Sequence, residues 1–125
     1  NYKRRMENEK SEWIHLGQSK AIEAFLPFVD DLDLALGSWN KDDLDEKTTA
    51  LLEGFLIIQK KLKKTLEDLG VKQIDCSGKF DPNFHEALMQ VESKDHESNE
   101  IVQVFNPGYL FKDKVLRHAR VSVAK

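Results

Sequence analysis

The fold is decided by the stretch IEAFLPFVDDLDLAL, residues 22–36. Its apolar residues recur at steps of three and four, which is the spacing of one face of an amphipathic helix. This seam consists of Ile22, Phe25, Val29, Leu32 and Leu36. Residues 1–21 ahead of it are mostly helix formers, with one glycine and no proline. Together they predict a helical arm of roughly 50 Å at 1.5 Å per residue. Such an arm must project or lie along a second copy of itself.

Gly17 predicts a local break, after which Ser19 is able to cap a new helix start.

A second helix is predicted after the turn-forming residues 37–40. Asp42 and Asp43 are expected to cap its start and Gly70 to end it. Its apolar face is wide, which calls for more than one neighbouring helix. Two such hairpins, one from each protomer, would form a four-helix bundle. The predicted dimerisation residues are the seam above together with Leu51, Phe55, Ile58 and Leu62. The alternative is a hairpin within one chain, covered by the C-terminal part; it leaves the arm before Ile22 without a partner, so we favour the dimer.

From Val71 onward the apolar period changes from that of a helix to that of strands. Strands are predicted over residues 72–75, 85–92, 101–105 and 115–123, separated by turn chemistry. Pro107-Gly108 suits the two central positions of a type II turn. The sequence therefore predicts an α+β protein, with a helical region over residues 1–70 and a small, mainly antiparallel β-domain over residues 71–125.

Composition limits the kinds of partner. The net charge of −3 gives no general attraction to nucleic acid or anionic membrane. The basic run Lys3-Arg4-Arg5 is followed at once by Glu7 and Glu9, so we interpret it as a solvated helix face. No apolar run approaches the roughly 20 residues that span a bilayer. A single cysteine suits a reducing compartment, and we expect a cytoplasmic protein. Because the sequence begins with Asn1 in the middle of a pattern, we also expect a segment ahead of it.

Residue types that perform chemistry are present without a catalytic arrangement. Cys76 has no base near it in sequence. Asp81-Pro82-Asn83-Phe84-His85 resembles a turn whose histidine bonds to local backbone more than a general base or metal site. The adjacent residues Asp95-His96-Glu97 cannot easily converge on one metal. No phosphate-binding loop or dinucleotide motif occurs. We therefore expect a binding or regulatory protein rather than an enzyme, with no cofactor and no metal.

Two longer motifs carry a resemblance to a known family. FDPNFHEAL (residues 80–88) is followed, after nineteen residues, by GYLFKDKVLRHARVSV (residues 108–123). NYKRR at residues 1–5, Leu26-Pro27 followed by residues 30–36, and Glu53-Gly54 extend the match over nearly the whole chain. This pattern resembles the GrpE family, the nucleotide exchange factors of DnaK-type (heat-shock protein 70) chaperones. Residues Glu12, Leu34, His118 and Arg120 depart from the common family pattern.

The resemblance implies a homodimer with paired long helices, a four-helix bundle and one β-domain per protomer. It implies that one chaperone binds one face of the dimer, and that a β-domain engages the nucleotide-binding domain so that ADP leaves faster. Transferred by position, the partner contacts fall on Lys3, Leu34, Gly54, Phe80, Phe105 and Val123. For Gly54 the alternative is helix packing within the bundle. For Phe105, expected at a hairpin tip, and for Val123 the alternative is the core of the β-domain. A second reading of the whole chain is a non-catalytic dimeric scaffold for another protein.

Overall fold

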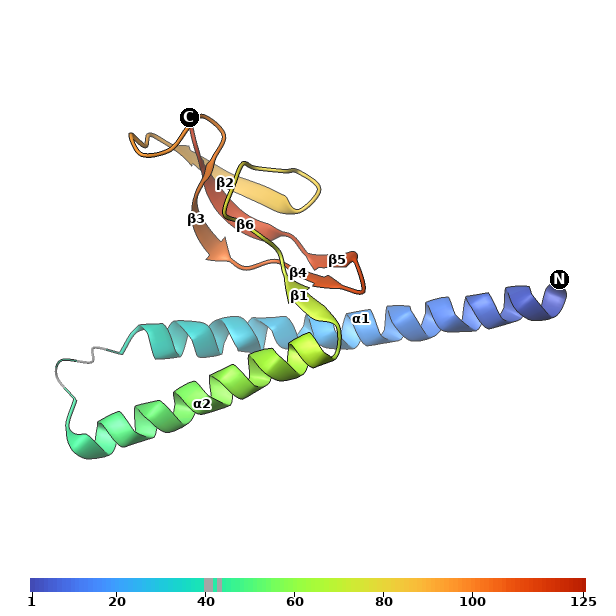
Figure 1. The fold of residues 1–125 in the computed structure, drawn as a ribbon, viewed down its shortest axis with the longest axis horizontal. Coiled ribbons are helices and arrows are strands. Elements are labelled where there is room, and N and C mark those ends of the chain that lie inside the picture. Colours follow the sequence, from blue (N-terminus) through green and yellow to red (C-terminus); the bar gives the residue numbers. More distant parts are fainter. Residues whose placement is uncertain (40–41, 43) are drawn as a thin grey trace. The chain divides into compact units, whose positions relative to one another are not determined.

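The computed structural model describes residues 1–39, 42 and 44–125 and divides into two compact units, Asn1–Gln59 and Lys60–Lys125. The first holds helix α1 (Tyr2–Gly37) and most of helix α2 (Glu46–Asp68). The second holds the end of α2 and six strands. The predicted α+β class is confirmed: two helices precede a small sheet region rich in antiparallel pairs (Figure 1). The units divide inside α2, whereas the predicted domain boundary after residue 70 stays a prediction.

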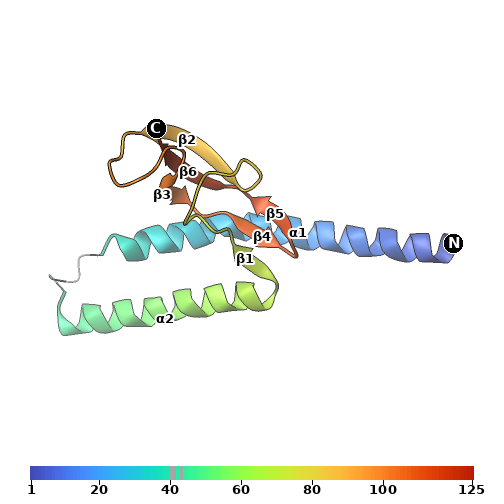
Figure 2. The same cartoon turned by 45° about the horizontal axis from the view of Figure 1, so that its top comes forward.

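Helix α1 runs without interruption from Tyr2 to Gly37, as both views show (Figures 1 and 2). Asn1 caps its start, with the side-chain oxygen accepting from the Lys3 amide at 3.1 Å. At its end, the Ser38 amide donates to the Leu34 carbonyl at 3.1 Å. The break expected at Gly17 and Ser19 is therefore wrong. A helix-interior glycine costs about 1 kcal/mol relative to alanine, which is less than the loss of a turn's hydrogen bonds.

Helix α2 begins at Glu46, and its cap is Asp45. The Asp45 carboxylate accepts from the Thr48 amide at 2.8 Å, which satisfies one of the unpaired donors of the first turn. The cap expected at Asp42 and Asp43 is thus misplaced by a few residues, and Asp43 lies outside the described residues. At the other end the prediction is confirmed: Gly70 has φ 99° and donates its amide to the Glu67 carbonyl at 3.0 Å.

One sheet joins three short antiparallel strands in the order β1 (Val71–Gln73), β4 (Tyr109–Phe111), β5 (Lys114–Arg117). β4 and β5 form a hairpin whose two turn residues, Lys112 and Asp113, have φ of 48° and 68°. Two positive φ values are the mark of a turn that matches the twist of the flanking strands. β4 was not predicted, because it pairs with β1, which lies far away in the sequence.

The other sheet has the order β2 (His85–Val91), β6 (Ala119–Ala124), β3 (Ile101–Asn106). β6 is central, antiparallel to β3 and parallel to β2, so the expected antiparallel β-domain includes one parallel pair. The single strand expected over residues 115–123 is wrong: it is two strands, β5 and β6, in different sheets, interrupted at His118. The core of this sheet consists of Ile101, Ala119, Val121 and Val123, with Cys76 and Phe80 packed against it.

The Pro107-Gly108 connection also differs from its prediction. It links β3 to β4, which belong to different sheets, so it is not the tip of a hairpin. Gly108 does not have the positive φ that a type II turn requires. A glycine is needed there for space: a Cβ would lie 2.8 Å from the Arg117 carbonyl oxygen and closer still to the Ala119 backbone nitrogen.

Candidate partner-binding surface

Three predicted contact residues belong to the sheet β2-β6-β3 and its approach. Phe80 lies just before β2 and is partly buried against the core. Val123, in β6, is 3% exposed and belongs to that core. Phe105, in β3, is 38% exposed. The structure therefore makes Phe105 the most accessible of the three, whereas Val123 supports the sheet from inside.

Phe105 lies at a shift in strand register. Val104 pairs with Val121, but the next paired residue of β3 is Asn106, opposite Arg120. Phe105 is therefore an extra residue in β3, as in a β-bulge, which turns a side chain away from regular alternation. Leu88 occupies the same position in β2, between Ala87 and Met89, and is 49% exposed. Leu88 was not identified from the sequence, because a bulge depends on the neighbouring strand.

The turn before β2 confirms the interpretation of the DPNFH segment. The Asp81 carbonyl accepts from the amides of Phe84 and His85, at 3.0 and 2.8 Å, and the Asp81 carboxylate accepts from Asn83. The His85 ring is 6% exposed and bonds to backbone through both nitrogens. A histidine held in this way has no free nitrogen with which to act as a base or metal ligand.

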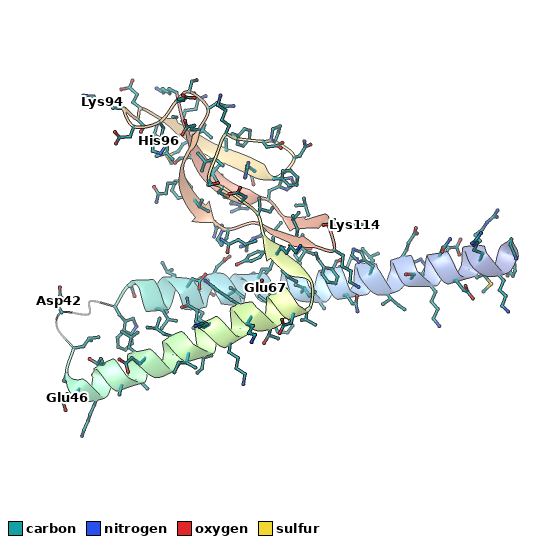
Figure 3. The ribbon with its side chains drawn as sticks, in the orientation of Figure 1. Asp42, Glu46, Glu67, Lys94, His96 and Lys114 are labelled. Carbon is teal, nitrogen blue, oxygen red and sulfur yellow. The ribbon has the colours of Figure 1, made fainter. Side chains whose placement is uncertain are left out.

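The remaining candidates for chemistry are also accounted for by local contacts. Burial, and then the neighbouring Asp75 carboxylate, raise the pKa of the Cys76 thiol, which disfavours the thiolate. The pKa of Asp75 is lowered by the side-chain and backbone hydrogen bonds of Ser77. His96 lies in the loop between β2 and β3, beside Ser93, whose hydroxyl is 2.7 Å from His96 Nδ1 (Figure 3). Within the described residues, no three His, Cys, Asp or Glu side chains group as a metal site.

The predicted contacts on the helices are all exposed. Leu34 is 74% exposed, and Lys3 lies on the first turn of α1. Lys3 lines a hollow of about 680 Å³ along the start of α1, shared with Tyr2, Met6 and Trp13. These three apolar side chains are between 52% and 77% exposed. A Cβ on Gly54 would meet no atom within 4 Å in the described chain, so packing within this chain does not require a glycine there.

The predicted dimerisation residues fall into three groups by their exposure. Val29 is 2% exposed and is already buried within the single chain, like Leu26 and Leu52. Ile22, Leu32, Leu36 and Leu62 are partly buried. The others remain open, at 40% to 63% exposed: Phe25, Leu51, Phe55 and Ile58. Further apolar residues that we had not assigned to the seam are open beside them, including Phe28 at 67% and Ile57 at 67%.

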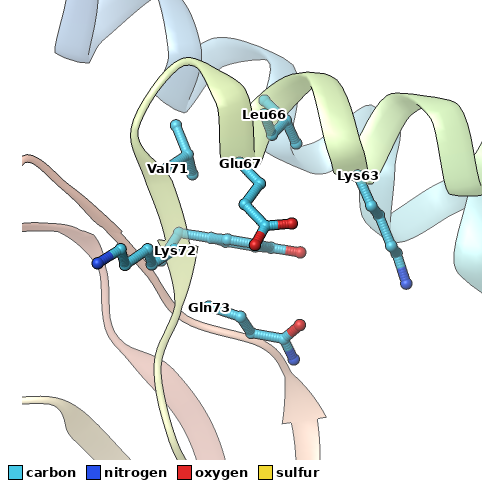
Figure 4. A pocket seen from close by; sticks show the side chains of 7 residues that line it. Lys63, Leu66, Glu67, Val71, Lys72 and Gln73 are labelled. Carbon is cyan, nitrogen blue, oxygen red and sulfur yellow. The ribbon is translucent and has the colours of Figure 1, made fainter.

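The second unit holds one further hollow, of about 260 Å³, which the sequence did not indicate. Figure 4 shows Lys63, Leu66 and Glu67 extending from α2, opposite Lys72 and Gln73 of β1. Val71 and Tyr109 complete its lining. Basic and acidic groups are both present, so its charge does not select one class of ligand. In the described part of the chain, no helix is long and apolar enough to cross a membrane.

Comparison with known proteins gives a consistent result. The sequence model of the GrpE family matches residues 1–125. Protein GrpE of Campylobacter curvus (strain 525.92) is 43% identical over 124 residues, covering 99% of this chain and 68% of the relative. Protein GrpE of Helicobacter acinonychis (strain Sheeba) is 41% identical over 125 residues, and that of Lachnoclostridium phytofermentans 37% over 124 residues. The chain spans 66% and 54% of the lengths of those two relatives. The resemblance seen in the sequence is thus confirmed, and the chain belongs to the GrpE family of co-chaperones.

Proposed function

We propose that this chain is an adenine-nucleotide exchange factor: it binds the nucleotide-binding domain of a DnaK-type chaperone in the cytoplasm and promotes release of ADP. The observation that carries the proposal is the match of the family along residues 1–125, including both motifs of the β-region. The chain would act by binding the open, ADP-releasing state more tightly than the closed state. Only such a difference in affinity shifts the equilibrium between the two states. No bond is made or broken.

The active form in this proposal is a homodimer. The support is the apolar surface that a single chain leaves open on both helices, notably Phe25, Phe28, Leu51 and Ile58 at 55% to 67% exposed. Apolar groups that cluster on one helical unit indicate an interface, because soluble monomers rarely expose large contiguous apolar patches. A four-helix bundle built from two hairpins would bury them. The long α1 helices would then lie along each other.

The proposed chaperone contacts are Lys3, Leu34, Gly54, Phe80, Phe105 and Val123. Phe105 is the strongest candidate for an apolar anchor, since it is 38% exposed, whereas Phe80 packs against the core of the sheet and Val123 belongs to that core. Lys3 would contribute a positive charge at the N-terminal end of α1. Val123, at 3% exposed, would act through the sheet that it supports rather than by direct contact.

The test is stopped-flow release of a fluorescent ADP from the cognate chaperone, with and without this chain. We expect a faster release rate; an unchanged rate would contradict the proposal. Lys3→Glu and Phe105→Ala should each reduce the stimulation while sedimentation still shows a dimer. Lys125→Glu, a charge reversal at an exposed residue outside the proposed contacts, is the control and should leave the release rate unchanged. Monomers after Phe105→Ala would mean that this ring supports the assembly rather than the partner.

A further inference from the structure

His85 forms a bridge between two points of the backbone, at Asp75 and Asp81, that are six residues apart. The Asp81 amide donates to His85 Nδ1 at 3.0 Å, so Nδ1 is the nitrogen without hydrogen. Nε2 therefore carries the hydrogen and donates it to the Asp75 carbonyl at 2.8 Å. The ring thus joins the segment that leaves β1 to the turn that enters β2. Both hydrogen bonds are made by the same neutral tautomer of the ring. His85 is buried, with only 6% of the residue exposed.

Phe80 lies between the two points that His85 joins. The two rings are tilted against each other by 40°, with centroids 6.0 Å apart. The Phe80 amide donates to the Asn99 carbonyl at 2.9 Å, and the next amide, that of Asp81, is the one bound by His85. The backbone of Phe80 is therefore fixed on its N-terminal side by Asn99 and on its C-terminal side by His85. Without His85, the turn could rotate about the Asn99 contact and carry the phenyl ring with it.

We propose that His85 is a positioning residue for partner recognition: it sets the orientation of Phe80 by holding the backbone on both sides of that residue. This inference rests on the proposed function for its partner, the DnaK-type chaperone. The exchange mechanism does not otherwise use this buried histidine. The proposal gives His85 a defined role at the contact surface. His85 itself would not touch the chaperone.

Hydrogen exchange tests the positioning without any chaperone. His85→Gln keeps a donor near the Nε2 position but loses the acceptor for the Asp81 amide, whereas His85→Asn keeps an acceptor near Nδ1. We expect the Asp81 amide to exchange at least about tenfold faster in His85→Gln than in His85→Asn, since it loses its partner. The amide of Ala124, bonded to the Glu100 carbonyl at 2.8 Å, is the internal control and should not change. Equal Asp81 exchange in both variants would overturn the proposal. If the variants do not fold, ¹⁵N signals of the wild-type ring decide it: the Nε2–H tautomer supports the proposal, and the Nδ1–H tautomer contradicts it.

A double-mutant cycle then tests the link to recognition. His85→Gln should weaken the chaperone complex by roughly five- to thirtyfold, because binding must then order the turn that the lost hydrogen bond held in place. In a Phe80→Ala background the same change should weaken it by less than about twofold, because the ring to be positioned is gone. Equal losses in the two backgrounds would overturn the proposal. If the wild-type chain fails to bind the chaperone at all, the proposed function falls, and the exchange data still decide whether His85 fixes the turn.

Discussion

Gly108→Ala should strongly destabilise the β-containing unit, and the structure shows why. The new Cβ would lie 2.8 Å from both the Arg117 carbonyl oxygen and Ile74 Cδ1, and closer still to the Ala119 amide nitrogen. Two of these three atoms are backbone and cannot rotate away. The glycine cannot retreat either. Its carbonyl accepts from the Ile74 amide at 2.8 Å, and the Pro107 carbonyl accepts from the Arg117 guanidinium at 3.1 Å.

The size of the effect follows from these contacts. Overpacking of this kind costs about 1–3 kcal/mol, and moving the backbone away would break a buried hydrogen bond worth about 1–3 kcal/mol. The chain would follow the less costly of these two responses, so we expect a loss of about 1–3 kcal/mol in the free energy of unfolding of this unit. For a unit of this size that corresponds to a fall of about 4–24 °C in its melting temperature.

Native-state hydrogen exchange of the β6 amides, such as those of Val121 and Val123, measures this loss within the unit concerned. Gly78→Ala is the matched control, because a Cβ there meets no atom within 4 Å in the described structure. Its effect should stay within about 0.5 kcal/mol. If Gly108→Ala is as mild as Gly78→Ala, then the close approach of the two sheets at this residue is not what requires a glycine.

Three further predictions concern the helices. Gly54→Ala should stabilise α2 by about 1 kcal/mol in thermal melts, because its Cβ meets nothing within the chain, yet it should weaken chaperone binding if a partner approaches this face; unchanged binding would contradict the proposed contact. The pKa of Asp45 is lowered mainly by its hydrogen bond with Thr48. The ionised carboxylate therefore stabilises α2 at a pH above the ordinary pKa of an aspartate, and this stabilisation is lost as the pH falls below about 4. Asp45→Asn, an equally good cap that does not titrate, should lose less helical circular dichroism over that range; identical acid profiles would contradict this assignment. The start of α1, where large apolar side chains are exposed, should melt before the sheets and give two thermal transitions, whereas one coincident transition would disagree.

Features encoded by neighbouring residues were predicted correctly from the sequence. The DPNFH turn is an example, because the hydrogen bonds that Asp81 makes with Asn83, Phe84 and His85 join residues four positions apart or fewer. The glycine end of α2 is another example. The helix break expected at Gly17 was wrong, because two local effects compete there. The cost of a glycine within α1 does not exceed the benefit of a continuous helix.

Features that depend on distant segments were missed. β4 forms because β1 offers it a partner, and the chain is interrupted at His118 because β5 and β6 join different sheets. Phe105 and Leu88 lie at register shifts against β6, which no pattern within either strand reveals. For Val123, the sequence left open a partner contact or a place in the core of the β-domain. Its side chain lies in the core.

In the proposed mechanism, this chain binds the ADP-free, open state of a DnaK-type chaperone more tightly than the ADP-bound state. The most direct test is its dissociation constant for the chaperone, measured by titration calorimetry with ADP present and absent. Linkage requires that the chain and ADP weaken each other's binding by the same factor. We predict markedly weaker binding with ADP present, and a matching loss of ADP affinity when the chain is bound. Equal dissociation constants in the two conditions would contradict the account, because a ligand with equal affinity for both states shifts neither.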